Sequence, residues 1–517
     1  MKKRLLLLLT GAILLQSLAG CTGNPLEESS EPYTEPTPQA EYDPARPTHL
    51  TVAAYEEDPQ RNEVLRQIAD KFEYDHPNVT IEIEAFPMDL DEGMQRLSAQ
   101  EEIDIFEVND HTATAFDNEG FSADLNSYIM GWEEGYSLTI AAKWAMYFGS
   151  VDRAFFIPSE IYTKALYYRA DLLAEEELSI PRFFSTVLSS GEQLQESGKV
   201  DYGFVMPLNE TDRYQIADYF IWSTIGLGRI ANVGAAYYVR DDSPETIFSL
   251  KGAEEALYTM KTMYDRLGPA SALSMDDGEV MKAFMEEEAF MVLSDSRSLK
   301  DYEKRGADGN WVDGTVADPP PDTGETGESP SQARSEAEEG EALPEEGGMK
   351  PQDWVVYPMP LGDGDPNIGI LSNEYRGWSI AENAPDQETA AAFLLYLSNS
   401  DNNTYLANLR GAIPIHSDAI ELDSYFSDSH FSGYQLLADR AAIGLYHYVQ
   451  PPKAYRCFTD YEGMANERYE DFLKGEVDAK TLLAELDAFW REAYETEGQR
   501  WASVPVIQEE SSMESES

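Results

Sequence analysis

Carboxylates are the side chains of this sequence with the greatest capacity for chemistry. The chain of 517 residues contains 96 Asp and Glu against 37 Lys and Arg. In glycoside hydrolases, paired carboxylates supply a general acid and a nucleophile or base, and the two groups lie about 5–10 Å apart. A sequence does not reveal such a separation, so a secreted lipoprotein glycoside hydrolase stays open as one interpretation.

Metal ligation has weak support. Histidines never stand at the i,i+3 or i,i+4 spacing that places two ligands on one helix face, since they occupy positions 49, 76, 111, 416, 430 and 447. One segment matches positions 1, 3, 5 and 12 of a calcium loop with Asp363, Asp365, Asn367 and Glu374. The sixth position of that loop requires glycine for a sharp turn, and Ile368 stands there. We therefore predict no metal and no cofactor.

Signatures of nucleotide binding and of nucleophilic catalysis are absent from the sequence. It contains no GxGxxG, no GxxxxGK[ST] and no GxSxG, and no motif surrounds Cys457. The formal net charge of −59 opposes nucleic-acid binding, because a polyanion is bound by Lys and Arg that release its counterions. These observations predict a protein that is not an enzyme and does not bind nucleic acid.

The N-terminus has the parts of an export signal. Basic residues at positions 2–4 precede an apolar run over 5–15, which is too short to span a bilayer. The following Leu-Ala-Gly-Cys, ending at Cys21, resembles the bacterial lipoprotein box, in which the cysteine is acylated and becomes the mature N-terminus. We predict a signal peptide over 1–20 and a lipid anchor on Cys21. The anchor would hold the protein at the cell membrane, on the extracellular or periplasmic side.

Three segments have the composition of disorder. Residues 21–47 are rich in Pro, Glu, Ser and Thr, which predicts a flexible tether. Residues 313–349 contain eleven acidic residues and one basic residue, which predicts an acidic disordered insertion. We expect residues 508–517 to form an acidic tail.

The rest of the sequence alternates between strand and helix patterns. Apolar residues alternate with polar or small ones over 50–54 and 79–83, with helical spacing over 64–72 between them and a third short strand over 103–106. This order predicts an α/β fold with a largely parallel sheet. Apolar stripes predict further helices over 256–267, 280–285, 391–397 and 482–490.

From about Leu50 to Trp490 the sequence resembles the family 1 extracellular solute-binding proteins of ABC importers. The most specific landmark is 157–172, where a proline, a ligand-side residue and a strand ending in Tyr168 precede a short helix. Arg169 stands where the family has Asn. Other fragments follow in the order of the family, at 72–82, 103–110, 121–128, 283–291, 357–362, 377–380, 390–397 and 411–414.

The resemblance implies a two-lobe periplasmic-binding-protein-like fold of type 2, with a mixed sheet and flanking helices in each lobe and crossing segments as the hinge. It implies capture of a solute between the lobes, delivery to an ABC permease, and a monomer. By analogy, lobe 1 takes 48–156 and 370–425, and lobe 2 takes 157–369 and 426–500.

Much of this family binds sugars, and the composition is compatible with that. The chain has 30 Tyr, 21 Phe and 8 Trp, whose planes suit the CH face of a sugar ring. We therefore predict a sugar or oligosaccharide as the ligand. A peptide or another polar solute, and a structural or adhesive surface lipoprotein, are alternatives.

Ligand contacts are carried over from the family position by position. Trp222 has core packing as a serious competing role, because it falls in a predicted helix. Arg297 stands where the family frequently has an aromatic residue, which favours a polar or acidic sugar. The predicted contacts are Tyr55, Glu56, Asn109, Asp110, Tyr162, Trp222, Asp295, Arg297, Tyr375, Arg376 and Trp378.

Overall fold

The computed structural model describes residues 46–496, apart from 56–58, 100–101, 148–152, 226–245, 306–352, 358, 361, 363–368, 372, 428–445 and 449–457. Several predictions from the sequence lie outside the described residues. They are the signal peptide, Cys21, the tether up to residue 45, the insertion over 313–349, Cys457, the tail over 508–517 and most of the calcium-like segment. In the described part of the chain, no helix is long and apolar enough to cross a membrane.

A five-stranded sheet combines the first four strands of the chain with one much later strand. Its strand order is β2-β1-β3-β9-β4. The parallel strands β1, β2 and β3 confirm the predicted parallel arrangement, whereas β9 runs antiparallel to both of its neighbours. The five strands are β1 (Thr48–Tyr55), β2 (Val79–Phe86), β3 (Ile105–Asn109), β4 (Ile157–Thr163) and β9 (Asn373–Ile380).

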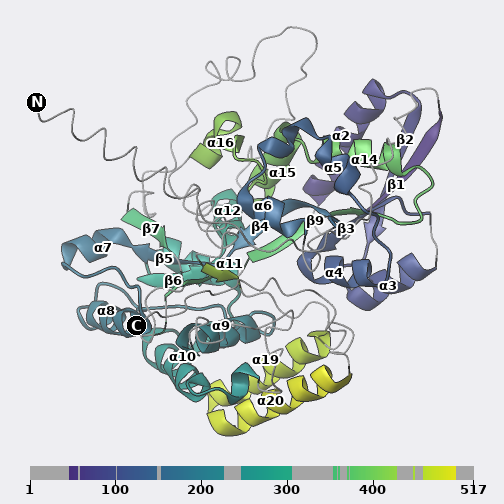
Figure 1. The fold of residues 1–517 in the computed structure, drawn as a ribbon. Coiled ribbons are helices and arrows are strands. Elements are labelled where there is room, and N and C mark those ends of the chain that lie inside the picture. The colour runs from purple at the N-terminus through teal and green to yellow at the C-terminus, as the bar shows by residue number, and fades with distance from the viewer. Residues whose placement is uncertain are drawn as a thin grey trace, which may run out of the picture. The chain divides into compact units, whose positions relative to one another are not determined.

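Helices lie on both sides of this sheet. Figure 1 shows α2 and α14 on one side and α3 and α4 on the other. The longer helices are α2 (Pro59–Asp75), α3 (Leu90–Ser98), α4 (Asp110–Asn118), α14 (Gln387–Leu397) and α15 (Ser400–Arg410). The shorter ones are α5 (Asn126–Met130), η1 (Glu133–Tyr136), α6 (Ile140–Ala145), α16 (Ala419–Leu422) and α17 (Ser424–Ser427).

A second, three-stranded sheet is antiparallel, with the order β6-β5-β7. It is formed by β5 (Ala165–Arg169), β6 (Met291–Ser294) and β7 (Trp354–Tyr357). A small parallel sheet pairs β8 (Gly369–Leu371) with β10 (Tyr446–Tyr448). The helices of this part are α7 (Ala170–Glu175), α8 (Phe184–Glu196), α9 (Arg213–Ile225), η3 (Ile247–Ser249), α10 (Ala253–Leu267), η4 (Ala270–Ser274), α11 (Asp277–Met285), α12 (Ser296–Arg305), α19 (Phe458–Lys474) and α20 (Ala479–Thr496).

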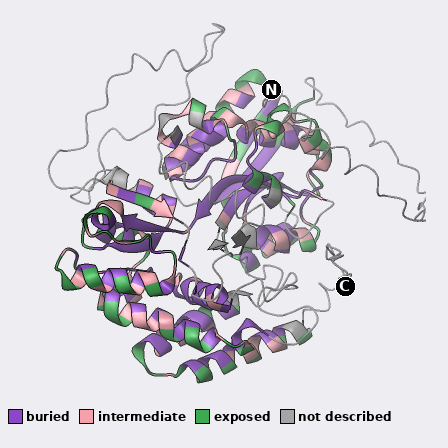
Figure 2. Ribbon diagram, turned by 60° about the vertical axis from the view of Figure 1, so that its left-hand side comes forward, coloured by how far each residue is buried: buried purple, intermediate pink, exposed green. Residues whose placement is uncertain are grey.

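Two hydrophobic cores correspond only in part to this division into sheets, because the first core also contains residues of β5, β6, β7 and α11. One core joins the inward faces of β1, β2 and β3 to α2, α14 and α15, and the other joins β5 and β6 to α8, α9, α10, α19 and α20. Figure 2 shows buried residues concentrated along the strands and on one face of most helices. The apolar stripes predicted at 256–267, 280–285, 391–397 and 482–490 coincide with α10, α11, α14 and α20 and face these cores.

Lys164 alone separates β4 from β5, and the chain changes sheets at this residue. The sequence prediction assigned 157–163 to lobe 2, whereas β4 pairs with β9 in the five-stranded sheet. All seven residues of β4 are buried, including the polar Ser159, Glu160 and Thr163. The segment from β4 to β5 is therefore a direct covalent connection between the two sheets.

Gly377 lets β9 and β4 approach closely. A Cβ at this position would lie 2.2 Å from the carbonyl oxygen of Ile157 and 2.7 Å from the Cα of Pro158. The pairing of the two strands shifts register between Pro158 and Glu160. The lack of a side chain at Gly377 thus fixes the separation of the two strands on which the polar residues discussed next are mounted.

Candidate functional site

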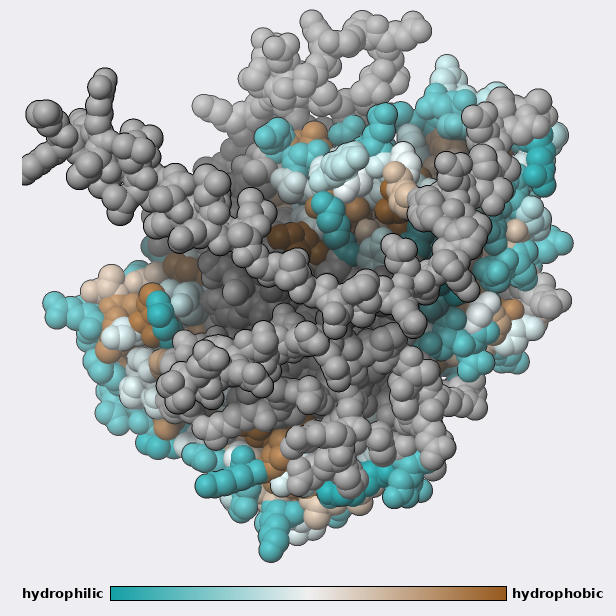
Figure 3. Space-filling model, in the orientation of Figure 1, coloured by the Kyte–Doolittle hydropathy of each residue, from teal (hydrophilic) through white to brown (hydrophobic). Residues whose placement is uncertain are grey.

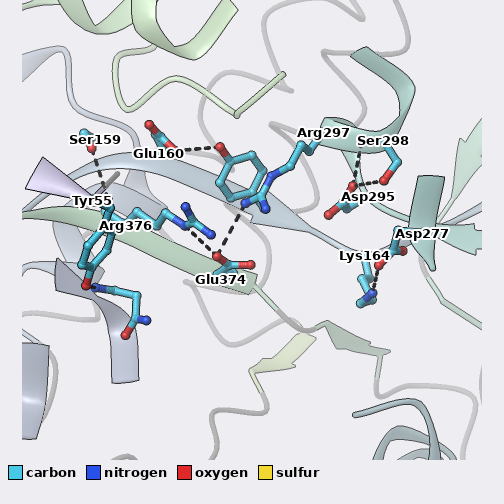
Figure 4. A network of polar contacts seen from close by, with 12 residues as sticks. Tyr55, Ser159, Glu160, Lys164, Asp277, Asp295, Arg297, Ser298, Glu374 and Arg376 are labelled. Carbon is cyan, nitrogen blue, oxygen red and sulfur yellow. Dashed lines mark hydrogen bonds and ion pairs between the residues drawn. The ribbon is translucent and has the colours of Figure 1, made fainter. Parts of the chain in front are cut away.

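Two neighbouring strands carry most of the polar side chains of the candidate site. In the pairing of β4 with β9, Glu160 lies opposite Arg376 and Tyr162 lies opposite Glu374. Residues two apart on a strand point to the same face, so these four side chains share one face of the strand pair. Figure 4 shows Glu160, Glu374 and Arg376 along the two strands, with Arg297 beside them.

The inner part of the network is a buried group of charges around Arg61. The Nη2 of Arg61 donates to Glu107, and its Nε donates to Oε1 of Glu160 over 3.3 Å. All three side chains are buried, and the Arg61 guanidinium lies 5.5 Å from the centroid of the Trp378 ring. Burial raises the pKa of the Glu107 carboxyl, an effect that the charge of Arg61 opposes. This group ties α2 to β3 and β4.

The outer part of the network is centred on Tyr162. Its hydroxyl donates to Oε2 of Glu160 over 2.7 Å, and the guanidinium of Arg297 lies 3.9 Å from the centroid of its ring. The Nη2 of Arg297 is 3.5 Å from Oε1 of Glu374. The Nε of Arg376 donates to that same oxygen over 2.8 Å. One carboxylate oxygen therefore serves two guanidinium groups.

The surrounding arginines create a positive local potential. Burial raises the pKa of Glu160, but the charges of Arg61, Arg410 and Arg376 outweigh burial and lower this pKa to about 2. Burial likewise raises the pKa of Glu374, and Arg376 and Arg297 lower it to about 2. Both carboxyls are consequently ionised at neutral pH, which makes them acceptors of hydrogen bonds and not proton donors.

A second group of charges surrounds Lys164, at the change of sheet. Its Nζ lies 3.1 Å from Oδ1 of Asp212 and also donates to Asp277. Burial raises the pKa of Asp277 to about 7, and the negative charges of Asp295 and Asp212 act in the same direction. The charge of Lys164 opposes this rise. The pKa of Lys164 is raised, since the two carboxylates outweigh its burial. This group ties the β4–β5 connection to the residue before α9 and to the first residue of α11.

Two side chains of the network remain accessible. Glu374 exposes 43% of its side chain and Arg297 exposes 26%, whereas Tyr162 and Arg376 are buried beneath them. An accessible carboxylate accepts hydrogen bonds and an accessible guanidinium donates them, so this arrangement can bind a small polar molecule. Figure 3 shows a mostly hydrophilic surface over the described residues of one face, with scattered apolar positions.

The structure brings three of the predicted contacts together, namely Tyr162, Arg297 and Arg376. Asp295 lies next to them at the start of α12, where its Oδ1 accepts from the backbone N–H of Ser298 over 2.8 Å. Asp295 thus has a helix-capping role in this arrangement.

Tyr55 and Asn109 lie together at the ends of β1 and β3. The hydroxyl oxygen of Tyr55 accepts from the backbone N–H of Asn109 over 3.0 Å. The side-chain oxygen of Asn109 accepts from the backbone N–H of Thr112 over 2.7 Å and caps α4. Both side chains have structural partners here, and their contact with a ligand stays a prediction.

The predicted aromatic contacts Trp222, Tyr375 and Trp378 are fully buried. Trp222 packs in the second core, the competing role that the sequence already indicated, and the other two lie in the first core. A fully buried ring offers no surface for stacking in this arrangement. Glu56 and the side chain of Asp110 lie outside the described residues.

Sequence reasoning missed the partners of these residues. The position of Glu160 indicates a buried partner, because a carboxylate in the largely apolar stretch 155–168 requires a counter-charge. The sequence gives no such indication for Arg61 and Glu107, because they come together only when α2 packs against the sheet. Glu374 entered the sequence analysis as part of a calcium-like loop, but its carboxylate pairs with Arg297 and Arg376. Among the described residues, no group of three His, Cys, Asp or Glu is placed to hold a metal ion.

Comparison with known proteins identifies the class. The family of bacterial extracellular solute-binding proteins matches residues 67–433. Among curated proteins, none matches the sequence. The chain belongs to the bacterial extracellular solute-binding proteins, as the sequence resemblance predicted.

Solved structures share the fold. The sugar-binding protein MalE from Xanthomonas citri is 14% identical, with a TM-score of 0.63 over 88% of this chain and 98% of that chain. Maltose-bound MalE3 from T. maritima is 15% identical, with a TM-score of 0.60 over 86% and 99%. A ribitol-bound solute-binding protein from Agrobacterium radiobacter K84 is 15% identical, with a TM-score of 0.60 over 87% and 100%. These likenesses confirm the predicted two-lobe α/β fold.

Proposed function

We propose that this chain captures a sugar or oligosaccharide for an ABC import system and delivers it to a membrane permease. Membership of the solute-binding family supplies the transport role. Proteins with the same fold are described as bound to maltose, ribitol and acarbose, which supports a polyhydroxylated solute. The carrying observation in this chain is the accessible pair of Arg297 and Glu374 above the buried Tyr162, because it offers donors and acceptors to hydroxyl groups.

A binding role fits the electrostatics better than hydrolysis does. Glu160 and Glu374 have pKa values of about 2, since neighbouring arginines outweigh the effect of burial, so neither carboxyl holds a proton at neutral pH. A general acid needs a pKa near the working pH. Asp277 has such a pKa, about 7 because of burial, but its carboxylate is engaged by Lys164.

Attachment to the membrane is the second part of the proposal. Cys21 follows a basic start and an apolar run and ends a segment that resembles the lipoprotein box, so we propose that it carries acyl chains and tethers a monomer at the outer face of the membrane. Growth of an expressing bacterium with labelled palmitate tests this. Label is expected on the wild-type chain and not on Cys21→Ser, which is expected to leave the membrane fraction. Labelled Cys21→Ser would refute the anchor.

Ligand capture is tested by thermal unfolding of the full chain, purified in a mild detergent, against a panel of saccharides and peptides. A solute that binds only the folded state adds about 2.7 kcal/mol of stability at one hundred times its Kd. We expect a rise with at least one saccharide, and chromatography of the mixture is expected to return that saccharide unchanged. A rise with peptides alone would favour the peptide alternative, and conversion of the saccharide would favour the hydrolase.

A further inference from the structure

Arg297 has hydrogen-bonding capacity that the described residues do not use. Its guanidinium rests on the face of the Tyr162 ring and pairs with Glu374 at 3.5 Å, a distance too long for a good hydrogen bond. Its Nε and Nη2 are buried atoms with no hydrogen-bond acceptor among the described residues. A buried N–H group without an acceptor is costly, so this guanidinium is suited to an acceptor brought by a ligand.

The carboxylate next to Arg297 is shared. Oε1 of Glu374 accepts from Nε of Arg376 over 2.8 Å and is also the atom nearest to Arg297. Because the shorter contact goes to Arg376, Glu374 satisfies Arg297 only in part. Arg297 therefore keeps two buried N–H donors without a full acceptor, beside the partly exposed carboxylate of Glu374.

The charges around the pair are unusual for this chain. Four guanidinium groups and four carboxylates act on one another around the strand pair: Arg61, Arg297, Arg376 and Arg410 with Glu107, Glu160, Glu374 and Asp295. Asp295 is also close to Arg297, and its carboxylate caps α12. In a chain with a net charge of −59, a cluster whose arginines balance its carboxylates is more favourable to a negative group than an average part of the chain.

We infer, on the basis of the proposed function, that the solute is an acidic saccharide whose carboxylate binds the guanidinium of Arg297. A planar guanidinium stacked on an aromatic ring keeps its N–H edge free, and that edge matches the two oxygens of a carboxylate. The hydroxyl groups of the same sugar donate to Glu374. A uronate offers both groups on one ring, whereas a neutral sugar leaves the excess donors of Arg297 with weaker acceptors.

The test compares uronates with their own methyl esters. Galacturonate, glucuronate and mannuronate, each as one to three units, are titrated calorimetrically into the full chain in mild detergent. Each methyl ester keeps the hydroxyl pattern and removes the charge. At least one free acid is expected to bind about tenfold or more tightly than its ester, because a hydrogen bond to a charged group is stronger than one to a neutral group. The preference is expected to fall at high salt.

Variants connect the preference to Arg297. Arg297→Gln is expected to bind acid and ester equally, and Arg297→Lys to keep part of the preference, since it keeps the charge and loses the planar fork. Arg182→Gln is the matched control, because Arg182 also lies over a tyrosine ring, 5.8 Å from the centroid of Tyr357 in the second sheet. It is expected to behave as wild type. Melting temperatures without ligand check that each variant is folded.

The outcomes separate this inference from the proposed function. If neutral sugars bind, and every uronate binds no more tightly than they do, the inference is overturned and the proposed function stands. An acid preference that persists in Arg297→Gln would also overturn it. No binding by any saccharide, acidic or neutral, would count against both.

Discussion

The guanidinium of Arg297 lies 3.9 Å from the centroid of the Tyr162 ring, and this contact joins the first turn of α12 to β4. The hydroxyl of the same tyrosine donates to Glu160 over 2.7 Å. Tyr162 therefore has two separable functions, one in its ring and one in its hydroxyl group.

Replacement of Tyr162 separates these functions. Tyr162→Phe keeps the ring and loses the hydrogen bond to a carboxylate, so it is expected to lower the free energy of unfolding by about 1.5–3 kcal/mol. Tyr162→Leu also loses the cation–π contact and is expected to cost about 0.5–2 kcal/mol more. Urea unfolding measures both. Tyr264→Phe is the control, since its exposed hydroxyl reaches the carbonyl of Ala270 only at 3.4 Å, and equal effects at the two sites would contradict the prediction.

Replacing each of two glycines by alanine is expected to change the free energy of unfolding in opposite directions. Gly377→Ala places a methyl group against the backbone of β4, and overpacking of this kind costs about 1–3 kcal/mol or more. Gly463, inside α19, has open space around its Cβ position, so Gly463→Ala is expected to add about 0.5–1 kcal/mol. Chemical denaturation of the two variants checks the signs. A tolerated Gly377→Ala would show that the two strands are less closely paired than described.

The buried charges around Arg61 predict that replacing this arginine greatly lowers the free energy of unfolding. A second substitution is expected to restore part of that free energy. Arg61→Met leaves Glu107 and Glu160 without their shared partner and is expected to cost about 3–5 kcal/mol. Adding Glu107→Gln removes one of the uncompensated charges and is expected to restore part of the loss. In contrast, Arg266→Met breaks an exposed pair with Glu192 and is expected to cost at most about 1 kcal/mol. Additive losses for Arg61→Met and Glu107→Gln would argue against coupling between these residues.

The local fold could be predicted from the sequence because burial imposes a period on it. Alternation over 50–54 and helical spacing over 64–72 identified β1 and α2 without any knowledge of partners. The position of β9 could not be found in this way. It pairs with β3 and β4, which lie more than two hundred residues earlier in the chain. The residue pattern of β9 does not indicate which strands it pairs with.

The same limit explains the site. Tyr162, Arg297 and Arg376 were predicted as individual positions, but the pairing of β4 with β9 places Tyr162 opposite Glu374, the carboxylate that both arginines contact. The aromatic residues Trp222 and Trp378 are among the predicted contacts because a sequence does not distinguish a ring in a cleft from a ring in a core. Their full burial is a consequence of tertiary packing.

Trp222 gives a direct test of that distinction. As a core residue, Trp222→Ala is expected to lower the free energy of unfolding by about 3–5 kcal/mol. Trp222→Phe is expected to cost less and to leave the affinity for a ligand at the wild-type value in the folded protein. Calorimetric titration of Trp222→Phe measures that affinity. A weaker affinity with unchanged stability would return Trp222 to the binding site.

Asp277 makes stability depend on pH in a direction that can be derived. Burial raises the pKa of Asp277 to about 7 in the folded protein, whereas an Asp in an unfolded chain titrates near ~3.9. Between these values the folded state binds more protons, so the contribution of Asp277 to stability is complete below about pH 4 and is lost as the pH rises through about 7. Burial raises the pKa of Asp117 to about 6, which gives the same sign over a narrower range. Glu160 and Glu374, whose pKa values are about 2 because arginine charges outweigh burial, act oppositely and only below about pH 4.3.

The free energy of unfolding is therefore expected to be higher at pH 5 than at pH 8. The net charge of −59 adds to this difference through self-repulsion, so a variant is needed to isolate Asp277. Asp277→Asn cannot ionise and is expected to reduce the difference between pH 5 and pH 8, and Asp117→Asn is expected to reduce it less, mostly below pH 7. Urea titrations at half-unit pH intervals measure these slopes. If Asp277→Asn keeps the full wild-type slope between pH 5 and pH 8, Lys164 holds Asp277 ionised throughout, and the pH dependence comes from other groups.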